Sequence, residues 1–553
     1  MTTTTSSGTA PIAFETRPER YRHWSLAIDG DSAQLTLAVE RFGGLDPTIE
    51  LKGNSYDLSV DIELHDAVQR LRFEHPEVRA VVIASADDRI FCSGANIHAL
   101  SRATHAHKVN FCKFTNETRL YIEEASAESG QRYIAACNGA TAGGGYELAA
   151  ACDEIVFVDD NASAVSLPEV PLLAVLPGTG GLTRVIDKRR VRPDFADRFA
   201  TMAEGVKGKR ARDWGLVDTL APRSRFAEVV AERVATARAA ANEAFRGPGI
   251  ALDALDPIVT ETQVAYRHVK LDLDHARRVV EITVSGPTAG QPHDAVAALG
   301  AAADWWPLRM ARELDDALLR LRFNEPQIGL LLLRTRGDPD LAHACGELLA
   351  ANPRSWFVRE TRLLLGRVLR RLDLTARSVF AIVDEGSSFA GPLFELLLAA
   401  DRVYVLDANG VAARPGSLSG GALPRWNGLS RLATRFLGDP ARVAAVRDAG
   451  RAGSLSARQL DDLGLATELI DAIDFEDDLR VAVEERASLS PDALTGMEAS
   501  LRFGGPETLA TKIFGRLSAW QNWIFTRPNA TGPAGALSLY GKPERPRFDY
   551  TRT

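Results

Sequence analysis

Apolar and polar positions alternate near the start of the chain, in segments such as SLAIDG and QLTLAVE. This period of two is typical of half-buried strands, and it predicts two strands within Trp24–Phe42. Over Val60–Phe73 the apolar residues recur at helical spacing, and Pro76 marks the end of the predicted helix. The continuous apolar run Ala80–Ala84 (AVVIA) then predicts a buried strand.

The same succession of elements continues along the chain. Phe91–Ile97 (FCSGANI) predicts a turn that leads into a helix, and Tyr133–Cys137 (YIAAC) predicts another buried strand. A glycine-rich loop, Asn138–Gly145, precedes a predicted helix at Tyr146–Cys152, and Ile155–Val158 predicts a third short strand. Because strands, loops and helices alternate, the sequence predicts an α/β fold.

Two segments of the first half recur in the second half. Glu63–Phe73 (ELHDAVQRLRF) resembles Glu313–Phe323 (ELDDALLRLRF), 250 residues later. Glu147–Val158 (ELAAACDEIVFV) resembles Glu395–Leu406 (ELLLAADRVYVL), 248 residues later. Chance similarity between amphipathic helices is the alternative explanation. Because the matches keep their order and spacing, the sequence favours two related domains in tandem.

The two halves differ in their chemistry. Three glycines, Gly143–Gly145, precede Glu147, whereas Ala390–Pro392 precedes the corresponding Glu395. When Pro177 is aligned with Pro424, Glu169 falls opposite Gly416. We therefore expect the second half to keep the fold and to lose the catalytic residues.

The length of 553 residues exceeds what one hydrophobic core usually supports. We expect a disordered N-terminus (1–20), a catalytic domain (21–257), a degenerate domain (258–473) and a helical C-terminal region (474–553).

The bulk composition argues against several classes of function. The net charge of −8 disfavours nucleic-acid binding, which needs a concentrated basic surface. No apolar run reaches the roughly 18–20 residues of a membrane helix, and the polar start MTTTTSSGTA does not resemble a secretory signal. The five cysteines form no CxxC pair, so we expect neither a disulfide scaffold nor a structural metal site, and a reducing cytoplasm fits best.

Two loops carry the candidate chemistry. Phe91–Ile97 and Gly139–Glu147 each follow a strand, contain glycine and open a helix, where free backbone N–H groups favour negative charge. If the loops converge, they could hold one carbonyl oxygen as it becomes an oxyanion. Glu147 could be an acid or base, or could simply interact with the helix dipole. Glu169 could do the same, or could be a solvated loop carboxylate.

Three segments, DRIFCSGANIHAL, CNGATAGGGYELAAACDEIV and SLPEVPLLAVLPGTGGLTRV, occur in this order over Trp24–Val217. Together they resemble the crotonase (enoyl-CoA hydratase/isomerase) family. The resemblance implies ββα spiral domains and backbone donors at Ala95 and Gly144 that stabilise a thioester enolate. It also implies that Glu147 and Glu169 are the acid/base residues, and having both suggests chemistry that involves water. Coenzyme A would belong to the substrate, and we expect no separate cofactor and no metal.

Within the family, the tandem arrangement and the C-terminal IFTRPN segment resemble carbon–carbon lyases of aromatic-derived CoA thioesters. Another enoyl-CoA hydratase and a non-catalytic acyl-CoA-binding protein are the alternatives. Asn96 and His98 depart from the family pattern of Asp and Lys. Cys112, beside Lys113, could be a further catalytic group if a cation lowers its pKa, or could be a buried apolar thiol. We expect a homodimer.

Overall fold

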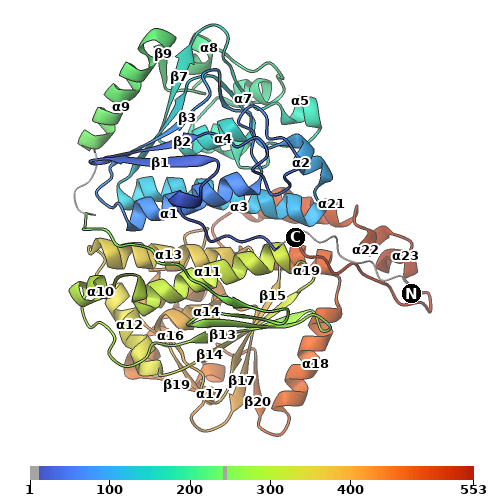
Figure 1. Ribbon diagram of the computed structural model, residues 1–553. Helices are drawn as coiled ribbons and strands as arrows, with labels where there is room; N and C mark the ends of the chain where they lie inside the picture. Colours follow the sequence, from blue (N-terminus) through green and yellow to red (C-terminus); the bar gives the residue numbers. More distant parts are fainter. Residues whose placement is uncertain (1–10, 241–245) are drawn as a thin grey trace. The chain divides into compact units, whose positions relative to one another are not determined.

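The computed structural model describes residues 11–240 and 246–553 (Figure 1). The chain forms two compact units. The first unit is Phe14–Leu252, and the second unit contains Asp253–Thr553. Part of the predicted disordered N-terminus, residues 1–10, lies outside the described residues.

The first unit contains a six-stranded sheet in the order β1-β2-β3-β5-β7-β9. Strands β1 and β2 pair antiparallel, and every later neighbour pairs parallel. The strands are β1 (Trp24–Asp29), β2 (Ser32–Leu37), β3 (Ala80–Ser85), β5 (Arg132–Cys137), β7 (Glu154–Asp159) and β9 (Thr219–Pro222). The strand predictions are confirmed, because the parallel strands are apolar runs buried in the unit.

The helices of the first unit include those predicted near residues 60–73 and 146–152. They are α1 (Leu58–Phe73), α2 (Ile97–Arg102), α3 (His105–Glu124), α4 (Gly144–Ala151), α5 (Glu169–Leu173), α6 (Gly181–Thr183), α7 (Pro193–Ala200), α8 (Gly208–Asp213) and α9 (Phe226–Ala240). Helix α1 begins after Asp57, whose side chain accepts a hydrogen bond from the backbone N–H of Ser59 at 2.9 Å. The predicted α/β class is confirmed.

A small parallel sheet in the first unit brings three segments together. It consists of β4 (Ile90–Cys92), β6 (Ala140–Ala142) and β8 (Val165–Ser166), in that order. The strands pair through Cys92 with Thr141 and through Thr141 with Val165. Since the carboxyl ends of parallel strands share one edge of a sheet, the segments that follow β4, β6 and β8 start side by side.

The second unit has an eight-stranded sheet in the order β10-β11-β12-β13-β14-β15-β17-β20. From β10 to β13 the neighbours are antiparallel, and from β13 onward they are parallel. The strands are β10 (Ile258–Val259), β11 (Gln263–Ala265), β12 (Val269–Asp274), β13 (Val279–Ser285), β14 (Leu330–Arg336), β15 (Ser378–Val383), β17 (Arg402–Asp407) and β20 (Glu468–Asp471). A small sheet adds β16 (Phe389–Ala390), β18 (Ala412–Arg414) and β19 (Leu455–Ser456).

The helices of the second unit lie between Ala295 and Leu539. They are α10 (Ala295–Ala301), α11 (Trp306–Asn324), α12 (Pro339–Ala351), α13 (Trp356–Asp373), α14 (Phe394–Ala399), α15 (Arg431–Arg435), α16 (Pro440–Ala452), α17 (Ala457–Asp462), α18 (Phe475–Ser488), α19 (Pro491–Arg502), α20 (Leu509–Lys512), α21 (Ser518–Ile524), α22 (Pro528–Thr531) and α23 (Ala536–Leu539).

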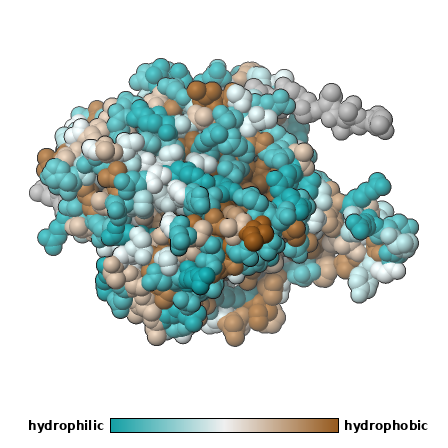
Figure 2. Space-filling model, turned by 90° about the horizontal axis from the view of Figure 1, so that it is seen from below, coloured by the Kyte–Doolittle hydropathy of each residue, from teal (hydrophilic) through white to brown (hydrophobic). Residues whose placement is uncertain are grey.

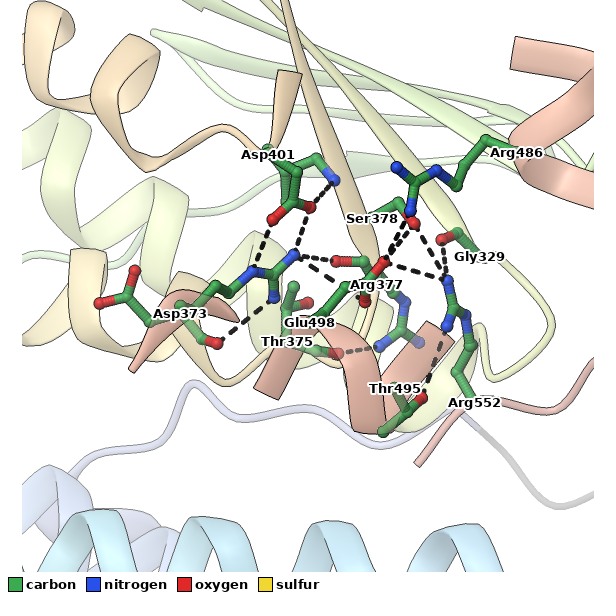
Figure 3. Close-up of polar contacts among 12 residues, drawn as sticks. Gly329, Asp373, Thr375, Arg377, Ser378, Asp401, Arg486, Thr495, Glu498 and Arg552 are labelled. Carbon is green, nitrogen blue, oxygen red and sulfur yellow. Dashed lines mark hydrogen bonds and ion pairs between the residues drawn. The ribbon is translucent and has the colours of Figure 1, made fainter. Parts of the chain in front are cut away.

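A buried polar network ties the C-terminal residues to the sheet of the second unit (Figure 3). Arg552 donates to the carbonyl oxygen of Gly329 at 2.9 Å, and Arg502 forms an ion pair with Asp401 at 2.6 Å. The carboxylate of Glu498 lies 3.9 Å from both of these arginines. Because buried charges need partners, the end of the chain is part of the packed core of this unit.

Among the described residues, no helix combines the length and the apolar composition needed to cross a bilayer. On the face drawn in Figure 2, apolar residues are scattered among polar ones.

Candidate active site

The two glycine-containing turns of the first unit touch each other. One turn follows β4 and contains Gly94, and the other follows β6 and leads into α4 at Gly144. A Cβ atom at Gly94 would lie 2.7 Å from the backbone nitrogen of Gly144 and 2.9 Å from the carbonyl oxygen of Ala142. The backbone at Gly94 also has φ +83°, which disfavours a side chain. The structure therefore brings together the loops that carry the candidate donors.

The backbone geometry leaves two N–H groups available at this contact. The N–H of Tyr56 donates to the oxygen of Gly94 at 3.0 Å, and the N–H of Asn96 donates to the oxygen of Tyr56 at 2.8 Å. These two hydrogen bonds form a parallel β-bridge between Tyr56 and Ala95. In this arrangement Ala95, which lies between Gly94 and Asn96, directs its own N–H away from Tyr56. Gly144 is the first residue of α4, so its N–H has no partner within the helix.

Glu169 lies beside the second turn. It follows β8 and is the first residue of α5, and a Cβ at Gly143 would lie 2.7 Å from its Oε1. Its Oε2 is buried and has no hydrogen-bond partner among the described residues. Burial raises the pKa of Glu169 to about 7, and the charge of Glu147 acts in the same direction. A carboxyl with this pKa can exchange a proton near neutral pH.

Glu147 lies almost one turn into α4 and is held by the loop that follows α5. Its carboxylate accepts hydrogen bonds from the N–H of Thr179 at 3.0 Å, from the Thr179 hydroxyl, and from the N–H of Gly181 at 2.7 Å. Burial raises the pKa of Glu147, while these hydrogen bonds and the charge of Arg119 oppose the rise. The side chain is thereby fixed in one orientation inside the protein.

The loop that holds Glu147 was not identified as functional from the sequence. Thr179 and Gly181 follow Pro177 in LPGTGG, within a segment that carried the resemblance, but their type alone does not identify a carboxylate partner. The amide of Asn116, from α3, anchors this loop by donating to the oxygen of Gly178 at 3.0 Å. The signal that could have located the loop is its cluster of glycines after a proline.

Cys112 is near the same loop, but the hypothesis of a lowered pKa is wrong. A Cβ at Gly178 would lie 3.4 Å from the Cys112 sulfur. Burial, together with the carboxylates of Glu147 and Asp61, raises the pKa of the Cys112 thiol to about 11. Carboxylates rather than a cation act on this sulfur, so Cys112 is a neutral thiol at neutral pH.

Asn96 and His98, which depart from the family pattern, have different surroundings. Asn96 is buried and caps α2 by accepting from the N–H of Ala99 at 3.0 Å, and its amide donates to the hydroxyl of Ser55 at 3.0 Å. Asn96 therefore fixes the turn that contains Ala95. His98 is exposed on α2.

The second unit has a different structure at the corresponding position. Gly391 has φ +53° and Gly143 has φ +52°, but the next residue is Pro392, which has no N–H to donate. Helix α12 packs directly on this segment, since a Cβ at Gly346 would lie 2.8 Å from the Cα of Gly391. Glu395 is buried and accepts a hydrogen bond from Ser419 at 2.6 Å. This segment therefore lacks one of the two backbone donors.

Comparison with known proteins identifies the relatives of this chain. The family model described as enoyl-CoA hydratase/isomerase matches residues 50–279. A protein of Aromatoleum evansii named benzoyl-CoA-dihydrodiol lyase is 53% identical over 543 residues, which cover 98% of this chain and 98% of that protein. An enoyl-CoA hydratase structure from Geobacillus kaustophilus is 30% identical, covers 40% of this chain and 75% of its own, and has a TM-score of 0.35. One from Bacillus anthracis is 24% identical, with coverages of 41% and 78% and a TM-score of 0.33. The family match and the full-length identity together show that this chain belongs to the enoyl-CoA hydratase/isomerase, or crotonase, family.

Proposed function

We propose that this protein is a lyase that opens the ring of 2,3-epoxybenzoyl-CoA. The reaction consumes two water molecules and yields 3,4-dehydroadipyl-CoA semialdehyde and formate. Support comes first from the benzoyl-CoA-dihydrodiol lyase relative, whose similarity extends over 98% of both chains. The observation that carries the proposal is the contact between the two turns, with Glu169 beside one turn and Glu147 on the helix that begins there.

In the proposed mechanism, the thioester oxygen accepts hydrogen bonds from the N–H groups of Ala95 and Gly144. Glu147 and Glu169 activate one water, which opens the epoxide or its oxepin isomer to a ring-opened aldehyde. The raised pKa of both carboxyls suits this role, because an acid or base works best when its pKa is close to the operating pH.

The second half of the reaction uses the same donors. A second water adds to the aldehyde, and cleavage of the adjacent carbon–carbon bond releases formate. The electron pair of that bond passes to the thioester as an enolate, whose oxygen is stabilised by Ala95 and Gly144. One of the two glutamic acids then returns a proton to carbon. Because water is the only co-reactant in this balance, we expect no redox cofactor and no metal. Cys112, as a neutral thiol, could donate a hydrogen bond in these steps.

The test is incubation of the protein with 2,3-epoxybenzoyl-CoA, with formate and the semialdehyde measured separately. We expect both products in equal amounts from the wild-type protein, and losses of roughly 10²–10⁴-fold in Glu147→Gln and Glu169→Gln. Formation of a hydrated thioester without formate would instead favour another enoyl-CoA hydratase. Binding of the thioester without any turnover would favour a non-catalytic acyl-CoA-binding protein.

We also propose that the second unit is a degenerate copy of the first. In the first unit, Tyr21 donates to Asp66 at 2.5 Å, and Arg70 donates to the same carboxylate at 2.7 Å. In the second unit the equivalent contacts join Tyr266 and Arg320 to Asp316, at 2.6 Å in both cases. The strand order β1-β2-β3-β5-β7-β9 of the first sheet also matches the order β12-β13-β14-β15-β17-β20 within the second sheet. Both agreements support duplication of one fold.

The buried glutamates of α1 and α11 support the same proposal. Glu63 accepts from the N–H of Trp24 at 3.0 Å, and Glu313 accepts from the N–H of Val269 at 3.2 Å, so each glutamate binds the start of a strand. The proposed domains are residues 21–257 and 258–473, with 474–553 as a helical extension. We further propose a homodimer, which light scattering can test.

A further inference from the structure

Tyr56 lies beside one of the two turns of the proposed oxyanion site. Its backbone pairs with the turn that contains Ala95, and only 3% of the residue is exposed. The ring lies next to two side chains of α3. Its centroid is 6.0 Å from that of Phe111, and the guanidinium of Arg119 lies 5.6 Å from it. Both contacts fix the direction of the ring, so the position of the hydroxyl is determined by the fold.

The hydroxyl of Tyr56 reaches the start of α4. A Cβ at Gly144 would lie only 1.9 Å from the Tyr56 oxygen, so the hydroxyl fills the space where a side chain would stand. Gly144 also supplies one of the two N–H groups that define the proposed site. The phenol oxygen therefore lies against the residue that supplies one of these two donors.

This hydroxyl is buried and has no hydrogen-bond partner among the described residues. By contrast, the buried hydroxyl of Tyr146 in the same unit donates to the oxygen of Leu216 at 2.9 Å. A buried hydroxyl without a partner destabilises the folded state, so it requires an explanation. A ligand atom that accepts this hydrogen bond would provide one.

We propose that the hydroxyl of Tyr56 is a third hydrogen-bond donor to the thioester oxygen, beside the N–H groups of Ala95 and Gly144. The inference rests on the proposed function, because that function places the thioester at these two groups. Tyr56 is then a catalytic residue, since it stabilises the enolate oxygen directly. The ring is held in one direction before the substrate binds, and the neighbouring atoms that cover the hydroxyl would move aside to admit the thioester oxygen.

The electrostatic surroundings suit a donor. Burial raises the pKa of Tyr56 well above its ordinary value, so the hydroxyl keeps its proton throughout the working pH range. The charge of Arg119 acts in the opposite direction, whereas the charges of Asp61 and Glu147 act in the same direction as burial. Arg119 is itself buried and forms an ion pair with Asp61, so its charge stays in place.

The alternative is that the hydroxyl only fills space, and the two explanations predict different results for Tyr56→Phe. This change keeps the ring and its contacts with Phe111 and Arg119 and removes only the oxygen. If the hydroxyl is a donor, kcat should fall by about 10²-fold with little change in KM, as for loss of one oxyanion donor. The melting temperature should rise, because an unpartnered buried group has been removed. Wild-type kcat in this variant would overturn the proposal.

Tyr21→Phe is the matched control. It also removes one phenol oxygen from the first unit, but this oxygen is bonded to Asp66 on α1. We expect this variant to keep the wild-type kcat and to have a lower melting temperature. A higher melting temperature in Tyr56→Phe and a lower one in Tyr21→Phe would show that the hydroxyl of Tyr56 has no partner in the free protein, whereas the hydroxyl of Tyr21 has one.

A binding measurement separates this inference from the proposed reaction. Benzoyl-CoA labelled with ¹³C at the thioester carbonyl cannot undergo epoxide opening, yet its chemical shift reports hydrogen bonding to the oxygen. On binding we expect a downfield shift in the wild type and a smaller one in Tyr56→Phe. An equal shift in both proteins would refute the role of Tyr56, whether or not formate is produced. If formate is absent but the shift differs, only the proposed reaction fails.

Site-specific 3-fluorotyrosine at position 56 provides a second variant that keeps the hydroxyl, should the phenylalanine variant fold poorly. The fluorinated phenol is more acidic and a stronger donor, so the downfield shift of bound benzoyl-CoA should increase. A shift equal to that of the wild type would count against the proposal.

Discussion

Glu169→Gln should make the protein more stable at alkaline pH while removing its activity. The native carboxyl has a pKa of about 7, raised by burial from 4.5. A carboxyl with a higher pKa in the folded state binds more protons when folded. Its contribution to stability is therefore most favourable below about pH 4.5 and declines as the pH rises towards 7. Glutamine remains neutral at every pH and avoids this decline.

The size of the effect follows from the shift. At about 1.4 kcal/mol per pKa unit, a rise from 4.5 to about 7 corresponds to about 3 kcal/mol. The side chain is only half-buried, so solvent screening reduces this to about 1.5 kcal/mol. Glu169→Gln should differ little from the wild type in stability at pH 5, where only a small part of the decline has occurred, and exceed it by about that amount at pH 8, a change of a few degrees in melting temperature.

The assay is thermal unfolding of both proteins at pH 5 and pH 8, combined with formate release at each pH. Wild-type turnover should rise with pH through about 7, since the ionised carboxylate acts as the base. This rise reports the coupled pair of Glu147 and Glu169 rather than one group alone. A stability difference that is the same at both pH values would refute the argument that Glu169 is desolvated in the native state.

Two further variants and one labelling experiment test the same geometry. Thr179→Val removes a hydroxyl that lowers the pKa of Glu147, so the rise of turnover with pH should move to higher pH, and an unchanged pH–rate profile would contradict this. Cys112 should react slowly with iodoacetamide at pH 8 and faster as the pH approaches 11, and rapid labelling at pH 8 would show that its thiol is not shielded. Glu395→Gln should leave formate release within twofold of the wild type, because Pro392, three residues earlier, supplies no N–H, and a large loss would show that the second unit takes part in catalysis.

The sequence alone determined the elements and several candidate residues. The strand at Ala80–Ala84 follows from a run of apolar residues, and the helix over Val60–Phe73 follows from apolar residues at helical spacing. Both elements are present in the folded chain. Glu147 and the two glycine turns could be selected because helix starts and glycines have a local physical meaning. The repeat of Glu63–Phe73 was also visible, since both copies conserve the same amphipathic face.

Only the tertiary structure decided how these parts work together. Strand β4 pairs with β6 through Ile90 and Ala140, 50 residues apart in the chain, and β6 pairs with β8 through Thr141 and Val165, 24 residues apart; no local pattern specifies such contacts. The pKa values of the side chains also depend on the tertiary structure. Cys112 is next to a lysine in the sequence, but in the fold the charges of two carboxylates raise its pKa. Tyr56 and Thr179 gave no signal in the sequence, because a hydroxyl acquires its role from what it contacts. Local periodicity is encoded in neighbouring residues, whereas burial, proton affinity and the meeting of two turns arise only when distant segments pack.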